Sequence, residues 1–284
     1  KASPDPAAPL NLTLSGSGIS AGGTAIDKIS ALLDGTRQQH RLRAEGSLKI
    51  DGKPLNLTLA ANGGLTGQNQ WQGSIGELNI AGALNLKLQN AMRLDAGAER
   101  VNLGAASWHA LGGSLRLEQL TWSKQAGLVS KGRADNLHLE QLHNFYTPPV
   151  QHNLVIAADW DLGYTQSPRG YFNLRQQGGD ITLPTPRKQP LGLQDFVLNT
   201  TLDGRGIHNR IAAGTRYGKI SGDYNIMQAF GGGKITAAPV SGSIRIEANE
   251  LDTFKSMMPV GQIIKGHLSA AAQINGTVSA PKLS

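Results

Sequence analysis

The sequence predicts an all-β protein: an elongated, curved, antiparallel-rich sheet that forms an open trough and carries a few short helices. Three observations predict it. Apolar and polar residues alternate from end to end, turn-forming clusters separate the alternating runs, and helical periodicity is confined to three short stretches. Composition agrees, because Gly contributes 36 of 284 residues and charged residues only 17%, below the roughly 25% typical of soluble domains.

The clearest strands alternate Leu or Ile with Asn, Thr, Lys or Arg. They lie at residues 10–14, 55–59, 84–88, 115–117 and 244–246. Because successive side chains of a strand point to opposite faces, each run places its apolar side chains on one face of the sheet. A sheet with one wet face favours antiparallel connections over parallel strands, which are buried on both faces.

Turn residues divide these strands into hairpins. Asp51-Gly52 joins residues 48–50 to 55–57, and Asp203-Gly204 joins 196–202 to 207–211, because Gly and Asp tolerate the positive φ that tight hairpins need. Further turns are expected at residues 62–64, 112–113, 178–180 and 231–233. The spacing predicts on the order of 16 to 20 strands.

Three stretches have helical spacing. They are residues 24–35, with Ile26, Ile29 and Leu33; residues 139–148, ending at Pro148; and residues 251–259, ending at Pro259. The last two also echo each other and predict a repeat of about 110 residues. We interpret residues 1–284 as a single trough segment, with a repeat boundary near the proline-rich residues 183–190.

Composition also restricts the class of protein. The formal charge is +7, but the Lys and Arg residues are scattered singly, and there is no Cys. No apolar run approaches the roughly 18 residues that a membrane helix needs. Because the chain begins at Lys1 without a signal core, we expect a piece of a longer protein whose anchor lies elsewhere.

The candidate catalytic patterns are weak. Residues 18–22 match Gly-x-Ser-x-Gly without a surrounding βα pattern, and residues 231–234 lack the spacing of a phosphate-binding loop. His138, His143 and His152 do not have zinc-ligand spacing, and the four Trp residues are too dispersed for a base-stacking platform. Asp159 and Asp161 share a strand face, which leaves a carbohydrate-active protein as a minor alternative. We therefore expect no enzymatic activity, no metal and no cofactor.

An apolar sheet face of this length needs a cover, because soluble monomers tolerate exposed patches of only a few hundred Å². Either the sheet closes into a sandwich or barrel, as in a binding or adhesin module, or it stays open and holds apolar ligands. The sequence has few aromatic or other bulky side chains to fill a closed core, which favours the open trough. The residues expected to line it, in contact with lipid or with a β-strand, are Leu55, Leu57, Leu59, Leu84, Leu86, Leu88, Leu115, Leu117, Ile244, Ile246, Leu268 and Ile274.

Residues 251–259, 264–270 and 274–281 form a short helix ending in Pro, a Gly-x-Leu strand and a Gly-Thr-x-x-x-Pro segment. In that order they resemble a repeat of the TamB family, the AsmA-like translocation and assembly module proteins, and residues 101–145 resemble it more loosely. The resemblance implies a periplasmic β-taco anchored in the inner membrane of a Gram-negative bacterium. It also implies a role in outer-membrane biogenesis, through phospholipid transport or through autotransporter assembly and protein secretion. The implied partners are phospholipid acyl chains or unfolded β-strands in the groove, and the outer-membrane barrel protein TamA through regions outside this segment, with no nucleic acid.

Overall fold

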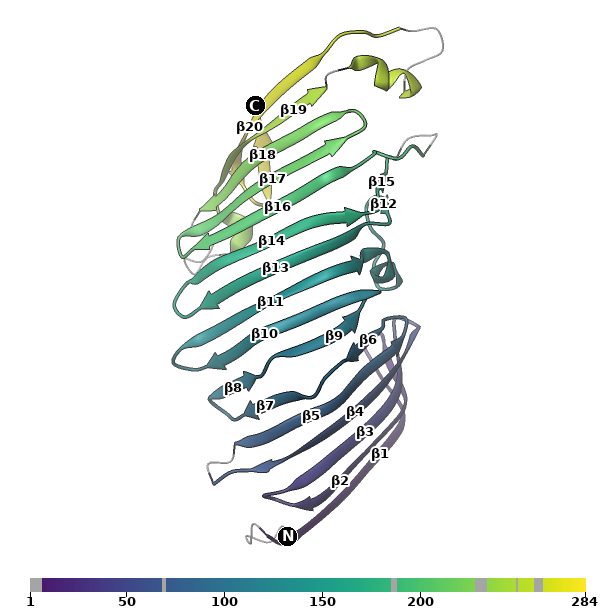
Figure 1. Cartoon of the computed structure of the whole chain (residues 1–284), viewed down its shortest axis with the longest axis vertical. Coiled ribbons are helices and arrows are strands. Elements are labelled where there is room, and N and C mark those ends of the chain that lie inside the picture. Colours follow the sequence, from purple (N-terminus) through teal and green to yellow (C-terminus); the bar gives the residue numbers. More distant parts are fainter. Residues whose placement is uncertain (1–6, 68–69, 185–187, 228–233, 249, 258–262) are drawn as a thin grey trace. The chain divides into compact units, whose positions relative to one another are not determined.

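A computed structural model describes residues 7–67, 70–184, 188–227, 234–248, 250–257 and 263–284. The chain divides into two compact units, Lys1–Thr147 (unit 1) and Pro148–Ser284 (unit 2). Both are almost entirely antiparallel β-structure, which confirms the predicted fold class (Figure 1). The boundary predicted near residues 183–190 concerns a sequence repeat and stays a prediction.

Unit 1 is built from antiparallel strands, and most of its long strands pair with the next long strand in the sequence. Its long strands are β1 (Pro9–Ala21), β2 (Thr24–Thr36), β3 (His40–Ile50), β4 (Lys53–Leu65), β5 (Trp71–Gly82), β10 (Gly113–Ser123) and β11 (Gly127–His138). Between β5 and β10 lie the short strands β6 (Leu86–Leu88), β7 (Met92–Ala96), β8 (Arg100–Leu103) and β9 (Ala106–Ala110).

The four short strands correspond to two long strands, each interrupted once: β6 with β7, and β8 with β9. Both β6 and β7 pair with β5, and both β8 and β9 pair with β10, while β6 pairs with β9 and β7 with β8. These interruptions help to explain why the described residues form 21 strands rather than the predicted 16 to 20. Leu84 lies in the bend that precedes β6, so the strand predicted over 84–88 begins two residues later.

Unit 2 repeats the same antiparallel order. Its strands are β13 (Val155–Tyr164), β14 (Pro168–Gly178), β16 (Gln194–Asp203), β17 (Gly206–Thr215), β18 (Gly218–Met227), β19 (Val240–Ala248), β20 (Leu268–Thr277) and β21 (Ala280–Leu283). A separate two-stranded sheet pairs β12 (Gln151–His152) with β15 (Ile181–Thr182).

The predicted helix at residues 24–35 is wrong, because this stretch is the strand β2. Its register with β3 shifts between Ile26 and Lys28, and the extra residue returns Ile29 and Leu33 to the face that Ile26 occupies. A β-bulge thus produces apolar spacings of three and four in a strand. Local spacing alone cannot distinguish this pattern from a helix.

The other two helical stretches are short helices, as predicted, but of the 3₁₀ type. They are η1 (Leu139–Asn144) and η3 (Leu251–Met257), and a third 3₁₀ turn, η2, spans Ile235–Ala237. The expected end of the third helical stretch, at 258–259, falls outside the described residues. In the part of the chain that the structure describes, no helix is long and apolar enough to span a membrane.

The two hairpins fall where the turn residues predicted them. Asp51 and Gly52, with φ of 47° and 77°, join β3 to β4 and place Leu48 opposite Leu55. At the β16–β17 turn the Asp203 carboxylate accepts hydrogen bonds from the backbone N–H groups of Arg205 and Gly206, at 2.8 and 3.0 Å. The turn predicted at 62–64 is wrong, because these residues lie within β4 and pair with the strands on either side of it. The glycine turn predicted at 231–233 lies outside the described residues.

Candidate functional site: one apolar sheet face in each unit

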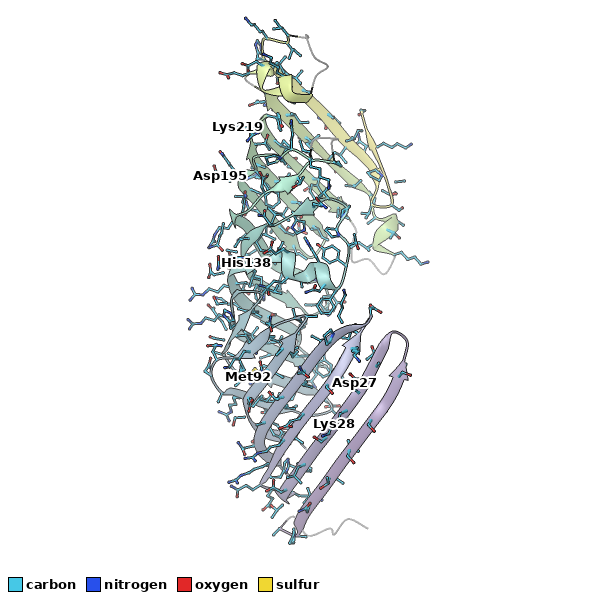
Figure 2. The ribbon with its side chains drawn as sticks, turned by 90° about the vertical axis from the view of Figure 1, so that its right-hand side faces the viewer. Asp27, Lys28, Met92, His138, Asp195 and Lys219 are labelled. Atoms are coloured by element: carbon cyan, nitrogen blue, oxygen red, sulfur yellow. The ribbon has the colours of Figure 1, made fainter. Side chains whose placement is uncertain are left out.

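Strand register in unit 1 aligns apolar side chains into continuous rows, because directly paired residues share a face. One row runs through Leu12, Leu33, Leu42, Ala61, Ile75 and Met92 on β1, β2, β3, β4, β5 and β7. A second runs through Gly46, Leu57, Ile80, Leu86, Ala110 and Gly113 on β3, β4, β5, β6, β9 and β10. We call this side the apolar face of unit 1. Met92 lies on it and Lys28 on the opposite polar face (both labelled in Figure 2).

Burial changes across the apolar face of unit 1. Leu55, Leu88 and Met92, on its inner strands, are each less than 9% exposed, whereas Leu12 and Leu14 on β1 are 58% and 57% exposed. Among the described residues no large side chain is fully buried. A closed sandwich or barrel would bury several, so the closed alternative does not describe this chain.

Unit 2 has the corresponding apolar face. Paired residues from β13 to β20 form the row Ala158, Leu174, Leu198, Ile211, Gly222, Ile244 and Ala272. Exposure again is high near the end of the chain: Ile246 on β19 is 42% exposed and Leu268 on β20 is 47% exposed.

The residues predicted to line the groove therefore divide by position. Leu55, Leu88 and Leu117 are buried; Leu57, Leu59, Leu84, Leu86, Leu115, Ile244 and Ile274 are half-buried; Ile246 and Leu268 are exposed. Apart from Leu84, which lies outside the strands, those of each unit share its apolar face. Their contact with lipid or with a client strand stays a prediction.

A His–Trp pair lies at one end of the apolar face of unit 1, where His40 is buried and Trp71 is half-buried. The indole N–H of Trp71 donates to Nε2 of His40 over 2.8 Å, and His40 Nδ1 lies 3.0 Å from the carbonyl oxygen of Thr36. Nε2 must accept, so Nδ1 carries the proton. The indole ring lies over Gly63 and Gly73, where a Cβ would lie 2.5 and 2.6 Å from ring atoms. Side-chain alternation does not predict this pair, although a glycine inside a strand, as at 63 and 73, often marks the close approach of another group.

The four Trp residues share one property that the sequence did not reveal. Trp71, Trp108 and Trp122 lie on the apolar face of unit 1, and Trp160 lies on that of unit 2. They are far apart in the sequence because each lies on a different strand, β5, β9, β10 and β13.

The residues considered for catalysis lie apart from the apolar faces or from each other. Residues 18–22 belong to β1 and its turn into β2, a strand-to-strand connection instead of the strand-to-helix turn of a nucleophile elbow. Asp159 and Asp161 lie on the polar face of β13, where Asp159 accepts a 3.0 Å hydrogen bond from Asn173. His138, His143 and His152 lie on β11, η1 and β12, and the described residues contain no cluster of three or more potential metal ligands.

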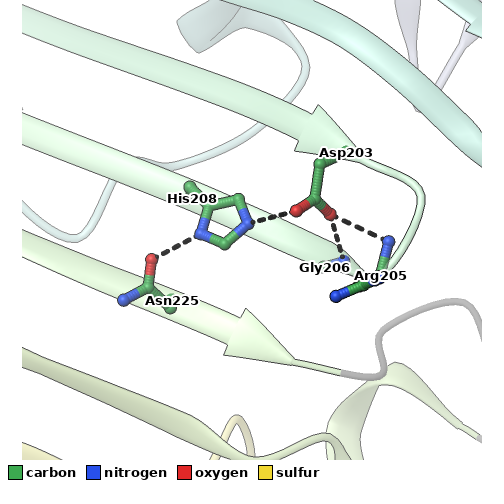
Figure 3. A network of polar contacts seen from close by, with 5 residues as sticks. All are labelled: Asp203, Arg205, Gly206, His208 and Asn225. Atoms are coloured by element: carbon green, nitrogen blue, oxygen red, sulfur yellow. Dashed lines mark hydrogen bonds and ion pairs between the residues drawn. The ribbon is translucent and has the colours of Figure 1, made fainter.

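The polar face of unit 2 carries a hydrogen-bonded histidine (Figure 3). One ring nitrogen of His208 lies 2.7 Å from Asn225 Oδ1, and the other lies 3.1 Å from the Asp203 carboxylate. The Asn225 and Asp203 bonds raise the pKa of His208 above 6.5. Hydrogen bonds from the Arg205 and Gly206 N–H groups, together with His208, lower the pKa of Asp203 to about 2.

These shifts predict a defined pH dependence. The raised pKa of His208 stabilises the folded state below pH 6.5, and this contribution is lost as the pH rises through the pKa of the folded state. The lowered pKa of Asp203 stabilises the folded state above pH 3.8, and this contribution is lost on acidification toward about pH 2. NMR titration should therefore place His208 above 6.5, and Asn225→Ala should lower its pKa more than Asp203→Asn. Asn199→Ala, on the same face, should leave it unchanged. A wild-type pKa at or below 6.5 would contradict this assignment.

These features define a class: all-β proteins whose antiparallel sheet has one apolar and one polar side. The family model described as TamB, N-terminal domain, matches residues 1–284, the whole chain, so the chain belongs to the TamB family. This confirms the resemblance found at residues 251–281 and extends it to the rest of the sequence. The comparisons with curated proteins and with solved structures gave no significant match. TamB proteins are non-enzymatic transport proteins of the periplasmic cell envelope.

Proposed function

We propose that the apolar faces form part of a groove that conducts phospholipid acyl chains between the inner and outer membranes, as a segment of a protein anchored in the inner membrane. The observation that carries the proposal is the continuity of apolar rows across neighbouring strands, combined with the lack of fully buried large side chains in the described part of the chain. Leu57, Leu86 and Ile244 in these rows are only half-buried, so they offer apolar contact to a ligand.

The energetic need for a groove is large. Moving a sixteen-carbon acyl chain into water costs about 0.8 kcal/mol for each CH₂, or about 12 kcal/mol for the chain. A continuous apolar face removes most of this barrier, because each segment of the chain exchanges one apolar environment for another. The rows described above contain no charged side chain, so they present no step at which an acyl chain must pass an ionised group.

Unfolded β-strands of autotransporters or outer-membrane proteins are the second candidate cargo. β1 favours it, because β2 is its sole pairing partner within the described residues and its other edge offers backbone N–H and C=O groups to an added strand. Delivery through the outer-membrane protein TamA, by parts of the protein outside this segment, belongs to the same proposal.

Site-specific photo-crosslinking in the bacterial envelope tests both cargoes. Leu86 and Lys87 are adjacent in β6 and lie on opposite faces. A photoreactive phenylalanine analogue replacing Leu86 is expected to capture phospholipid, and the same analogue replacing Lys87 is expected to capture none. A polypeptide adduct at 86 would favour the strand cargo. Equal labelling at both positions, or none at 86, would overturn the proposal.

A further inference from the structure

One row of the apolar face of unit 2 contains a polar interruption. The register places Trp160, Phe172, Thr200, Asn209, Tyr224 and Gly242 side by side on β13, β14, β16, β17, β18 and β19. The row on one side passes through Leu198 and Ile211, and the row on the other side passes through Leu202 and Ile207. Thr200, Asn209 and Tyr224, which we call the polar rung, are thus enclosed by aliphatic side chains.

The polar rung is buried enough for its hydrogen bonds to matter. Asn209 is 8% exposed, and it is one of two buried polar residues among those described. Thr200 Oγ1 donates to Asn209 Oδ1 over 2.8 Å, whereas Asn209 Nδ2 reaches the carbonyl oxygen of Tyr224 over 3.5 Å. The second bond is at the limit of a hydrogen bond. A buried amide held this loosely is unfavourable unless another acceptor completes it.

The Asn209 amide nitrogen and the Tyr224 hydroxyl provide free hydrogen-bond donors in the polar rung. Asn209 Nδ2 has two N–H groups and one weak partner, and the Tyr224 hydroxyl has no partner among the residues that the structure describes. The side-chain carbonyl Oδ1 already accepts from Thr200. A ligand that brings an acceptor oxygen would complete the Asn209 amide, and the Tyr224 hydroxyl can donate to a second acceptor of the same ligand.

The polar rung also lacks charge. Neither its own row nor the two flanking rows from β13 to β18 contain Lys, Arg, Asp or Glu. Phosphate oxygens are held best by cationic groups, so neutral donors favour a neutral acceptor. Among groups attached directly to long apolar chains, the ester carbonyl has this chemistry. On the basis of the proposed lipid groove, we infer that Asn209 and Tyr224 bind the ester carbonyl oxygens of a diacyl phospholipid, while the flanking Leu and Ile rows contact its acyl chains.

The inference is tested with two phospholipids that have the same headgroup and chain length and differ only in ester or ether linkage. The 284-residue chain should bind the dipalmitoyl diester about tenfold more tightly than the dihexadecyl diether, since each neutral hydrogen bond contributes a several-fold difference. Asn209→Leu and Tyr224→Phe should each reduce this preference, and the double variant should abolish it while retaining binding of the diether.

The controls separate this inference from the proposed function and from a structural role. Asn199→Leu, on the polar face of β16 next to Thr200, should keep the ester preference. Equal wild-type affinity for the two lipids, or an unchanged preference in the double variant, would overturn the inference and leave the groove intact. Failure to bind either lipid would overturn both. A role for Asn209 in stability alone predicts a lower melting temperature with the ester preference unchanged.

Discussion

Replacement of Leu57 by Arg is expected to reduce the phospholipid recovered with the protein at least tenfold. Leu57 lies in the middle of a row of the apolar face, between Gly46 on β3 and Ile80 on β5. Placing a guanidinium among acyl chains costs about 2.5–3.5 kcal/mol. Because each 1.4 kcal/mol changes a binding constant tenfold, lipid binding should weaken by more than tenfold. Lipid extraction and mass spectrometry of detergent-free protein measure the effect.

The matched control is Thr58→Arg. Thr58 is the next residue of β4 and lies on the polar face, where its hydroxyl donates a 3.1 Å hydrogen bond to the Glu77 carboxylate. An arginine at this position can therefore pair with Glu77 and remain in contact with water. This variant should retain wild-type lipid. Circular dichroism and thermal melting establish that both variants fold. If the two arginine variants lose lipid equally, the apolar face is not the binding surface.

Trp71→Ala is expected to destabilise unit 1 by about 3 kcal/mol, the typical cost of truncating a packed Trp. The substitution removes the ring that covers Gly63 and Gly73 and leaves the 8%-exposed His40 without its hydrogen-bond donor. For a unit of this size the melting temperature should fall by on the order of 10 °C. Differential scanning calorimetry measures it, and hydrogen exchange should locate the loss of protection at β3, β4 and β5.

Trp71→Phe divides the effect into its two parts. The phenyl ring still covers the two glycines but donates no hydrogen bond to His40, so the loss should be about 1–2 kcal/mol. A melting temperature of Trp71→Ala within 2 °C of wild type would show that the indole contributes little to the sheet.

Alternation and turn chemistry predicted the sheet well because both are local. The alternating runs Leu48-Lys49-Ile50 of β3 and Leu55-Asn56-Leu57 of β4, with the Asp51-Gly52 turn between them, determine a hairpin without reference to the rest of the chain. Residues 24–35 could not be assigned in this way. The β-bulge after Ile26 depends on pairing with β3, and without that pairing the spacing of Ile29 and Leu33 fits a helix equally well.

The candidate site was predictable only in part. The apolar identity of Leu55, Leu57 and Leu86 followed from alternation, but their burial did not: Leu55 is 6% exposed, whereas Leu12, in an identical pattern, is 58% exposed. Position within the sheet sets that difference, since inner strands are covered by neighbours that an edge strand lacks.

The sequence by itself determined that this chain is a one-sided antiparallel β protein, because side-chain alternation and turn residues act over a few positions. Only the tertiary structure decided which residues meet across strands. Thr200 with Asn209 and His40 with Trp71 are brought together by register, which depends on pairing along whole strands and is not encoded in any single one.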